Sequence, residues 1–449
     1  MNKDQKLFSE SALLWIRTLL CERYGHQFEL SEIDQVLFLT LPGENKNIRF
    51  DNLQEIFHQS RSDFPCELWN ASSEGFFAPI KQEIPAPSAT ELATPLIEFD
   101  LQGAALHYDV LGLSYWLLTR LEEVGQSDLD SHQRFPAESS HGFLNNYLDR
   151  PIVDEWLIIL GQVIQCVWPQ IVLKCHKFSI NVSHDVDRPS LYAFQSWATI
   201  TRMMLGHLLK RKDIDSFLCA LKVKLSNRSS LHQSDPFNTF DWLMDLSETH
   251  GLKSSFYFIC GRTDLVLDAD YEPEHPAIRE LMRRIHRRGH EIGLHPSYQT
   301  FLKPELIRAE ADRLKKICLQ EEIHQEKWGG RMHYLRWRQP VTLRAWEQAG
   351  MDYDSTLGYP NYPGFRCGTC HEFPAFDPEF QKTLKVRIKP LILMESAITG
   401  QNIFMSNIVD RMCTIKDRCQ LVGGDFNILW HNSSLVTNDE RVAYIESIR

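Results

Sequence analysis

From residue 178 onward, short apolar segments typical of β-strands alternate with segments of helical periodicity. One of the latter, "HPAIRELMRRIHRRGH", places Ile278, Leu281, Met282 and Ile285 on a single helix face. Alternating strands and helices predict a parallel sheet or a (β/α) barrel. In such barrels the catalytic groups lie at the carboxyl ends of the strands. The expected strands are "KFSINVSH", "SSFYFICG", "HEIGLH", "DYDST" and "FNILWH".

The preceding residues lack this rhythm, and we expect them to form a smaller α/β domain over residues 1–172. The first 25 residues predict an amphipathic helix that ends near Gly25 rather than a signal peptide. The Pro- and Ala-rich stretch 81–96 predicts a loop. The second domain is then 173–449, and it carries a helical insertion at about 190–230 whose Lys and Arg residues form a solvated face.

The composition limits the partners. The formal net charge is -11 and the pI is about 5.9, which disfavours nucleic acid and anionic membranes as partners and favours a neutral or cationic small substrate. The sequence contains no run of the roughly 20 apolar residues that a membrane span needs. We therefore expect a cytoplasmic protein; the sequence does not indicate its oligomeric state.

The 11 cysteines are an odd number spread along the chain, as expected for free thiols in a reducing compartment. The segment "RCGTCHEF" has the C-x-x-C-H spacing of c-type haem attachment in Cys367, Cys370 and His371. Because such attachment occurs in exported proteins, we interpret it as a loop with two ordinary cysteines. A structural zinc site needs four ligands, and the sequence has no second C-x-x-C.

Polar side chains follow several of the expected strands. Asp185 and Asp187 end the first strand, His295 ends "HEIGLH" and His431 ends "FNILWH". A carboxylate and an imidazole together can bind a divalent metal, which would relieve the repulsion between the two aspartates and leave one of them to act as a base. The alternative is that the aspartates cap a following helix.

Five segments, in order, resemble motifs of the NodB-like polysaccharide deacetylases, carbohydrate esterase family four, in the branch with an extra N-terminal domain. They are "SHDVD", "GLKSSFYF", "GHEIGLHPSYQ", "GGRMHYLRWRQP" and "LWH". The resemblance covers about residues 175–449 and implies a distorted parallel (β/α) barrel.

The resemblance also implies roles for individual residues. Asp185 would be the general base and His431 the general acid, and Arg331 would hold the base. Asp187 and His295 would bind a divalent metal, expected to be zinc.

Two departures from the family pattern leave questions open. Gln299 stands where the family commonly has a second metal-binding histidine, and an amide oxygen is a poorer zinc ligand than imidazole. The arginine motif departs from Arg-x-Pro, so Arg336 and Arg338 compete with Arg331. His333 and Arg366 are candidate substrate-binding residues.

The resemblance, together with the residues at the strand ends, implies a metal-dependent hydrolase that removes an N-acetyl group from a carbohydrate, in the metabolism of a surface polysaccharide. One alternative is an amidohydrolase acting on a non-sugar amide or imide, although such relatives often lack the first aspartate. The other is a non-catalytic carbohydrate-binding protein with a decayed metal site, which would hold no stoichiometric metal.

Overall fold

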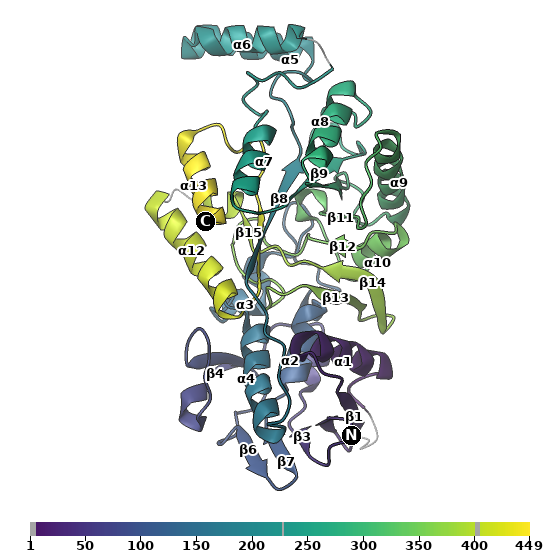
Figure 1. Cartoon of the computed structure of the whole chain (residues 1–449), viewed down its shortest axis with the longest axis vertical. Helices are drawn as coiled ribbons and strands as arrows, with labels where there is room; N and C mark the ends of the chain where they lie inside the picture. Colours follow the sequence, from purple (N-terminus) through teal and green to yellow (C-terminus); the bar gives the residue numbers. More distant parts are fainter. Residues whose placement is uncertain (1–5, 227–228, 400–404) are drawn as a thin grey trace.

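A computed structural model of the chain describes residues 6–226, 229–399 and 405–449. Figure 1 shows the N-terminal elements at one end, a large sheet surrounded by helices in the middle, and a pair of helices, α5 and α6, at the opposite end. No helix among the described residues is both long and apolar enough to cross a membrane.

The N-terminal part contains a five-stranded sheet in the order β1-β2-β3-β7-β6, in which only β3 and β7 are parallel. A separate antiparallel pair is formed by β4 and β5. The elements are α1 (Glu10–Tyr24), β1 (Glu29–Ile33), β2 (Val36–Thr40), β3 (Asn47–Phe50), β4 (Cys66–Asn70), β5 (Glu83–Pro87), β6 (Ile97–Asp100), β7 (Gly103–Leu106), α2 (Val110–Leu118) and α4 (Ile152–Val167).

Two local expectations for this part have different outcomes. Helix α1 ends where predicted, because Gly25 adopts a left-handed conformation with φ of 77° and its N–H caps the helix. The stretch 81–96 is not entirely loop, since it contains β5. That strand includes Pro85 and Pro87, which lack an N–H, and such residues are tolerated in a two-stranded edge pairing.

The large sheet has nine strands in the order β13-β14-β12-β11-β10-β9-β8-β16-β15, and every pairing except β13 with β14 is parallel. The strands are β8 (Ser179–Val186), β9 (Ser254–Ile259), β10 (Glu291–His295), β11 (Gly329–Gly330), β12 (Tyr353–Asp354), β13 (Phe373–Asp377), β14 (Lys382–Ile388), β15 (Leu393–Met394) and β16 (Asp425–Leu429).

This sheet is curled, and a single stretch of chain connects its two sides. Strand β14 pairs with β12, and β15, which only four residues separate from β14, pairs with β16. Between them, the N–H of Leu391 donates to the carbonyl of Leu357 at 3.0 Å, and the N–H of Ile392 donates to that of Asn427 at 3.0 Å. The α/β class is therefore as expected, and the carboxyl ends of β8 to β12 and β16 lie along one rim.

Helices cover the outside of the curled sheet (Figure 1). Helix α8 buries the predicted face, with Ile278, Leu281, Met282 and Ile285 fully buried. Burial of each such side chain stabilises the fold by about 1.5–3 kcal/mol. The helices are α7 (Phe240–Thr249), α8 (Pro276–Arg287), α9 (Pro304–Gln320), α10 (Val341–Gln348), α11 (Ser396–Thr399), α12 (Met405–Leu421) and α13 (Asn438–Ile448).

The N-terminal part shares its hydrophobic core with the large sheet. The indole N–H of Trp15 in α1 donates to the carbonyl of Pro374 in β13 at 2.8 Å, and the N–H of Val153 in α4 donates to that of Gly368 at 2.9 Å. The expected domain boundary near residue 172 stays a prediction.

The expected insertion is helical. It comprises α5 (Trp197–Leu205), a π-helical turn η5 (Gly206–Arg211) and α6 (Ile214–Leu225), and it follows the carboxyl end of β8.

Candidate active site

Asp185 is the last residue but one of β8, and a buried arginine fixes its carboxylate. Nη1 of Arg331 lies 2.8 Å from Oδ1 of Asp185, and both side chains are almost fully buried. The guanidinium also donates from Nε to the carbonyl of Ser355 at 2.9 Å and from Nη2 to Oγ of Ser183 at 2.9 Å. Arg331 is therefore rigidly held, and it leaves Oδ2 of Asp185 facing the rim.

A glycine brings Arg331 to this position. A Cβ atom on Gly330 would lie only 1.8 Å from the carbonyl oxygen of Leu294, so only glycine allows β11 to approach β10 this closely. The N–H of Arg331 then donates to the same carbonyl at 3.0 Å.

Asp187 follows β8 directly, and three histidines surround it. Oδ1 of Asp187 lies 3.2 Å from Nε2 of His295, while Oδ2 lies 3.6 Å from Nε2 of His333 and 3.4 Å from Nε2 of His431. His295 ends β10, and His431 lies two residues after β16. The rim thus brings together the four side chains that the sequence placed at strand ends, and it adds His333.

The outer nitrogens of two histidines have fixed acceptors. Nδ1 of His295 lies 2.6 Å from the carbonyl oxygen of Arg331, and Nδ1 of His333 lies 3.0 Å from Oδ1 of Asp268. Because a carbonyl and a carboxylate only accept hydrogen bonds, each Nδ1 carries the proton. Each Nε2 can then present a lone pair towards Asp187, which is the arrangement of a metal-binding histidine.

The contact between His295 and Asp187 fits a bound cation. Nε2 of His295 and Oδ1 of Asp187 are both buried, and neither forms a hydrogen bond within the described part of the chain. With the proton on Nδ1, the two facing atoms are both electron-rich, so their approach is unfavourable unless a positive charge lies between them. One donor atom each from Asp187, His295 and His333 lie within 4.8 Å of one another. One carboxylate with two imidazoles is a suitable ligand set for zinc or a similar divalent ion.

His431 has a second acidic partner. Its Nδ1 is hydrogen bonded to Oε1 of Glu395, a buried residue that follows β15, and its Nε2 points towards Asp187. Burial lowers the pKa of His431, but Glu395 and Asp187 outweigh it and hold the pKa well above its usual value. The side chain can therefore hold a proton at Nε2 beside the metal ligands.

Burial and neighbouring charges also act in opposite directions on the pKa values of His333 and Asp187. Burial lowers the pKa of His333, but the negative charges of Asp187 and Asp268 raise it to about 9. Burial raises the pKa of Asp187, but the surrounding histidines, His333 first, hold it well below its usual value. A charged His333 beside a charged Asp187 is thus favoured, and a metal ion bound at Nε2 of His333 would have to displace its proton.

Asp185, Asp187, His295, His333 and His431 line a cavity of about 300 Å³ together with Tyr334. His132 and Arg134 of the N-terminal part also line it. Nδ1 of His132 lies 2.9 Å from the hydroxyl of Tyr298, and Nη1 of Arg134 donates to the carbonyl of Tyr334 at 2.8 Å. Nothing in the local sequence around residues 132–134 indicates this role, because it depends on contacts about 200 residues away.

The turn that carries His333 is strained. Tyr334 and Leu335 have φ angles of 59° and 54°, which side chains other than glycine rarely adopt. Such conformations cost about 1–3 kcal/mol each and concentrate at functional sites.

Gln299 does not line this cavity. Its amide oxygen lies 3.3 Å from Nη1 of Arg336, and the guanidinium of Arg336 stacks on Tyr298 and Phe301. The histidine that completes the group around Asp187 is His333, 34 residues further along the chain. Among the three candidate arginines, Arg331 is the one in contact with Asp185.

Arg366, a candidate for substrate binding, does not line the cavity either. It is buried, and its Nε and Nη2 donate to the carboxylate of Glu123 at 2.9 and 2.6 Å, while Nη1 donates to the carbonyl of Gly358. All three guanidinium nitrogens thus form contacts within the protein. The structure places Arg366 in a buried ion pair rather than at the cavity, where the sequence had suggested it.

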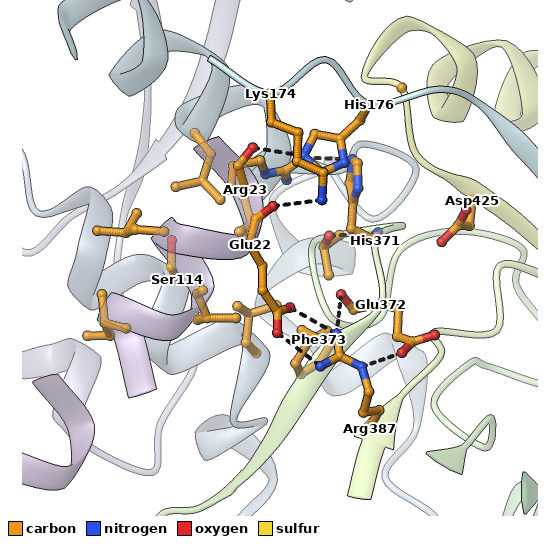
Figure 2. A pocket seen from close by; sticks show the side chains of 18 of the residues that line it. Glu22, Arg23, Ser114, Lys174, His176, His371, Glu372, Phe373, Arg387 and Asp425 are labelled. Atoms are coloured by element: carbon orange, nitrogen blue, oxygen red, sulfur yellow. Dashed lines mark hydrogen bonds and ion pairs between the residues drawn. The ribbon is translucent and has the colours of Figure 1, made fainter. Parts of the chain in front are cut away.

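The C-x-x-C-H segment lies at the opposite, amino end of the sheet, beside a cavity of about 370 Å³ (Figure 2). Both thiols are fully buried. Donor atoms of Cys370, His371 and Asp154 also lie within 4.8 Å of one another. However, Arg23 forms an ion pair with Asp154, and its Nη1 lies 2.6 Å from Nε2 of His371. The positive charge of Arg23 therefore already neutralises Asp154, whereas Asp187 faces three histidines.

Comparisons with known proteins give a family match for the N-terminal part and distant structural likenesses. Residues 10–169 match the model of a family of unknown function, DUF7033. No curated protein matches the chain. A putative polysaccharide deacetylase from Mycobacterium smegmatis is 13% identical with a TM-score of 0.40, and the match covers 61% of this chain and 84% of that one.

Two further solved structures are similar over 61% of this chain. The Puue allantoinase is 11% identical with a TM-score of 0.36 and 83% of its chain covered. A probable polysaccharide deacetylase from Pseudomonas aeruginosa PAO1 is 14% identical with a TM-score of 0.34 and 84% covered. These structures are distant from the chain, so its function has to be inferred from its own site.

Proposed function

We propose that the protein is a metal-dependent hydrolase that removes an N-acetyl group from a carbohydrate. The observation that supports this most strongly is the combination at one rim: a three-residue metal-binding group flanked by a carboxylate held by arginine and a histidine held by glutamate. A base on one side and an acid on the other are what hydrolysis of an amide requires.

In this proposal Asp187, His295 and His333 hold the metal, with zinc as the expected ion. When bound, a divalent ion lowers the pKa of water and polarises the acyl carbonyl. Asp268 and the carbonyl of Arg331 orient the two imidazoles, so that both Nε2 atoms point inwards.

Asp185 is the proposed general base. Arg331 occupies its Oδ1, which leaves Oδ2, 3.6 Å from Nε2 of His295, to take a proton from the attacking water. The buried guanidinium fixes the direction of this carboxylate. A base in this position contributes about 10²–10⁴ to the rate.

His431 is the proposed general acid. Glu395 holds its Nδ1 and favours the protonated ring, so Nε2 can donate a proton to the departing amine nitrogen. This makes the products a carboxylic acid and an amine, with the C–N bond of the amide broken.

A sugar fits the remaining surface of the cavity. Tyr334 and His132 line it with ring centroids 4.7 Å apart and ring planes tilted by 36°, and the guanidinium of Arg134 also faces it. Aromatic rings beside donors suit the apolar face and hydroxyl groups of a sugar ring.

Acetate release from a panel of N-acetyl sugars and nucleotide sugars tests the proposal, with Zn²⁺, Co²⁺ or Mn²⁺ added to purified protein. We expect stoichiometric metal and acetate release, and loss of release in Asp185→Asn with the metal retained. A non-catalytic binder would release no acetate with any metal. Release of ammonia or a non-sugar amine from other amides, without acetate release, would instead support an amidohydrolase.

A further inference from the structure

The insertion formed by α5, η5 and α6, which we call the helical arm (residues 197–225), exposes an unusual amount of apolar surface. It lies across the end of the molecule opposite the N-terminal sheet (Figure 1). Its own small core consists of Ile200, Ala220 and Val223 together with Tyr192. Seven large apolar side chains of the arm are 41–71% exposed: Trp197, Leu205, Leu208, Leu209, Ile214, Leu218 and Leu225.

The exposed apolar residues of α6 share one face of the helix. Ile214, Leu218 and Leu225 are exposed, and the half-buried Leu221 lies between the last two at helical spacing, so the four form one stripe. Ala220 and Val223, on another face, pack against α5. Helix α6 thus has one apolar face used for folding and a second that faces solvent, and exposed apolar surface of this extent typically marks a binding surface.

The arm is also basic in an otherwise acidic chain. Residues 197–225 contain six Lys or Arg and two Asp, whereas the whole chain has a net charge of -11. Within the described residues, none of the exposed basic side chains forms an ion pair: Arg202, Lys210, Arg211, Lys212 and Lys222. Three of them are consecutive at the turn between the helices, next to the exposed Leu208 and Leu209.

We propose that the helical arm binds the surface of a membrane that contains anionic lipids. Apolar side chains interleaved with unpaired basic ones are the features of a helix that lies in the lipid interface, with its apolar face among the acyl chains and its basic residues at the headgroups. The 9 and 12 residues of α5 and α6 are far too few to span a bilayer, so the arm lies on the surface. The negative net charge of the whole chain disfavours an anionic membrane as a partner, but it does not reveal that basic residues are concentrated in the arm.

A second copy of the chain is a less suitable occupant of this face. Two arms meeting along their α6 stripes would bring two clusters of unpaired basic side chains together, and this like-charge contact is unfavourable. An anionic surface instead complements both the charge and the apolar stripe.

The arm leaves the sheet at the edge that carries the candidate active site. Trp197 begins α5 ten residues after Asp187, beyond the carboxyl end of β8. Membrane binding is nevertheless independent of the proposed hydrolase activity, because it uses none of the residues of that site.

Co-sedimentation of the full chain with vesicles tests the proposal. We expect binding to vesicles of phosphatidylcholine and phosphatidylserine to be about tenfold or more stronger than to phosphatidylcholine alone, and to weaken as salt is raised. Equal binding to the two kinds of vesicle, or binding to neither, would overturn the proposal.

Matched variants locate the binding surface. Lys210→Glu with Arg211→Glu and Lys212→Glu should abolish the preference for phosphatidylserine. The control Lys303→Glu with Lys316→Glu and Lys327→Glu changes the net charge equally, at exposed positions outside the arm, and should bind as the unmodified chain does.

A second pair of variants tests the apolar side chains. Leu208→Ser with Leu209→Ser should reduce binding about tenfold or more, whereas Leu101→Ser with Leu265→Ser, which are more exposed, should not. Equal losses in arm and control variants would overturn the proposal. So would a mass measurement in solution that shows a dimer which the arm variants convert to a monomer, because the face would then bind a second copy. Circular dichroism confirms that each variant is folded.

Discussion

Nε2 of His333 lies 3.6 Å from Oδ2 of Asp187, and Nδ1 of the same ring lies 3.0 Å from Oδ1 of Asp268. Asp268 thus orients the imidazole, and Asp187 is a second ligand of the same candidate metal site. Gln299, in contrast, is turned towards Arg336. These contacts favour His333 over Gln299 as the third metal ligand.

We predict that His333→Ala lowers metal affinity by more than about 100-fold, because it removes one of three ligands. Asp268→Asn should lower it by about 10- to 100-fold, the usual effect of losing an outer partner of a metal-binding histidine. Gln299→Ala is the matched control and should retain its metal. Competition with a chromogenic chelator measures all three affinities, and loss of metal in Gln299→Ala alone would contradict the assignment.

The raised pKa of His333 predicts how the stability of the metal-free protein depends on pH. Its folded-state pKa of about 9 lies above the ordinary value of 6.5, so folding favours the protonated ring. This stabilisation is complete below about pH 6.5 and is lost as the pH rises through about 9. We expect the free energy of unfolding to fall by on the order of 2–3 kcal/mol over that range, with His431 adding to the loss in the same direction.

Urea unfolding in the presence of a chelator, at several pH values, measures this dependence. The variant His333→Gln should show a smaller slope than the unmodified chain. Metal affinity should increase over the same pH range, since binding requires the neutral imidazole. A slope that is unchanged in His333→Gln would show that other groups cause it.

Part of the site could be predicted from the sequence because parallel strands end at one edge. Asp185, Asp187, His295 and His431 lie at or just beyond the carboxyl end of a strand long enough to be recognised by its apolar residues. His333 and Glu395 follow β11 and β15, which have only two residues each and therefore no periodic pattern. The sequence identified His333 as a pocket residue but gave no reason to place it beside Asp187.

Other contacts depend on distant parts of the chain. Arg366 is paired with Glu123, 243 residues earlier, and no local pattern distinguishes such a pair from an arginine in a pocket. The fold was predicted best where helices and strands are long, as in α8 and β8. It was predicted least well in the strand β5, where the two prolines indicated a loop.

A change at Glu395 tests the proposed acid. Burial lowers the pKa of His431, and the charge of Glu395 is the main factor that raises it again. Glu395→Gln removes this charge while keeping an acceptor of similar size, so the pKa of His431 should fall. We expect the alkaline limb of the pH profile of kcat/KM to move to lower pH. Glu379→Gln, at an exposed carboxylate, is the control, and an alkaline limb that stays in place in Glu395→Gln would exclude this role for Glu395.

The last prediction concerns the ion pairs that join the N-terminal part to the large sheet. Glu123 accepts hydrogen bonds from Arg366 and, at 2.8 Å, from Nε of Arg120, and all three side chains are at most 3% exposed. Glu123→Gln leaves a buried positive charge without its partner, so the free energy of unfolding should fall by about 3–5 kcal/mol. Asp63→Asn, whose ion pair with Arg61 is exposed and screened by solvent, should leave it almost unchanged. Urea unfolding followed by tryptophan fluorescence measures both values. A loss in Glu123→Gln no larger than in Asp63→Asn would show that the two parts are held together by their shared apolar core rather than by this network.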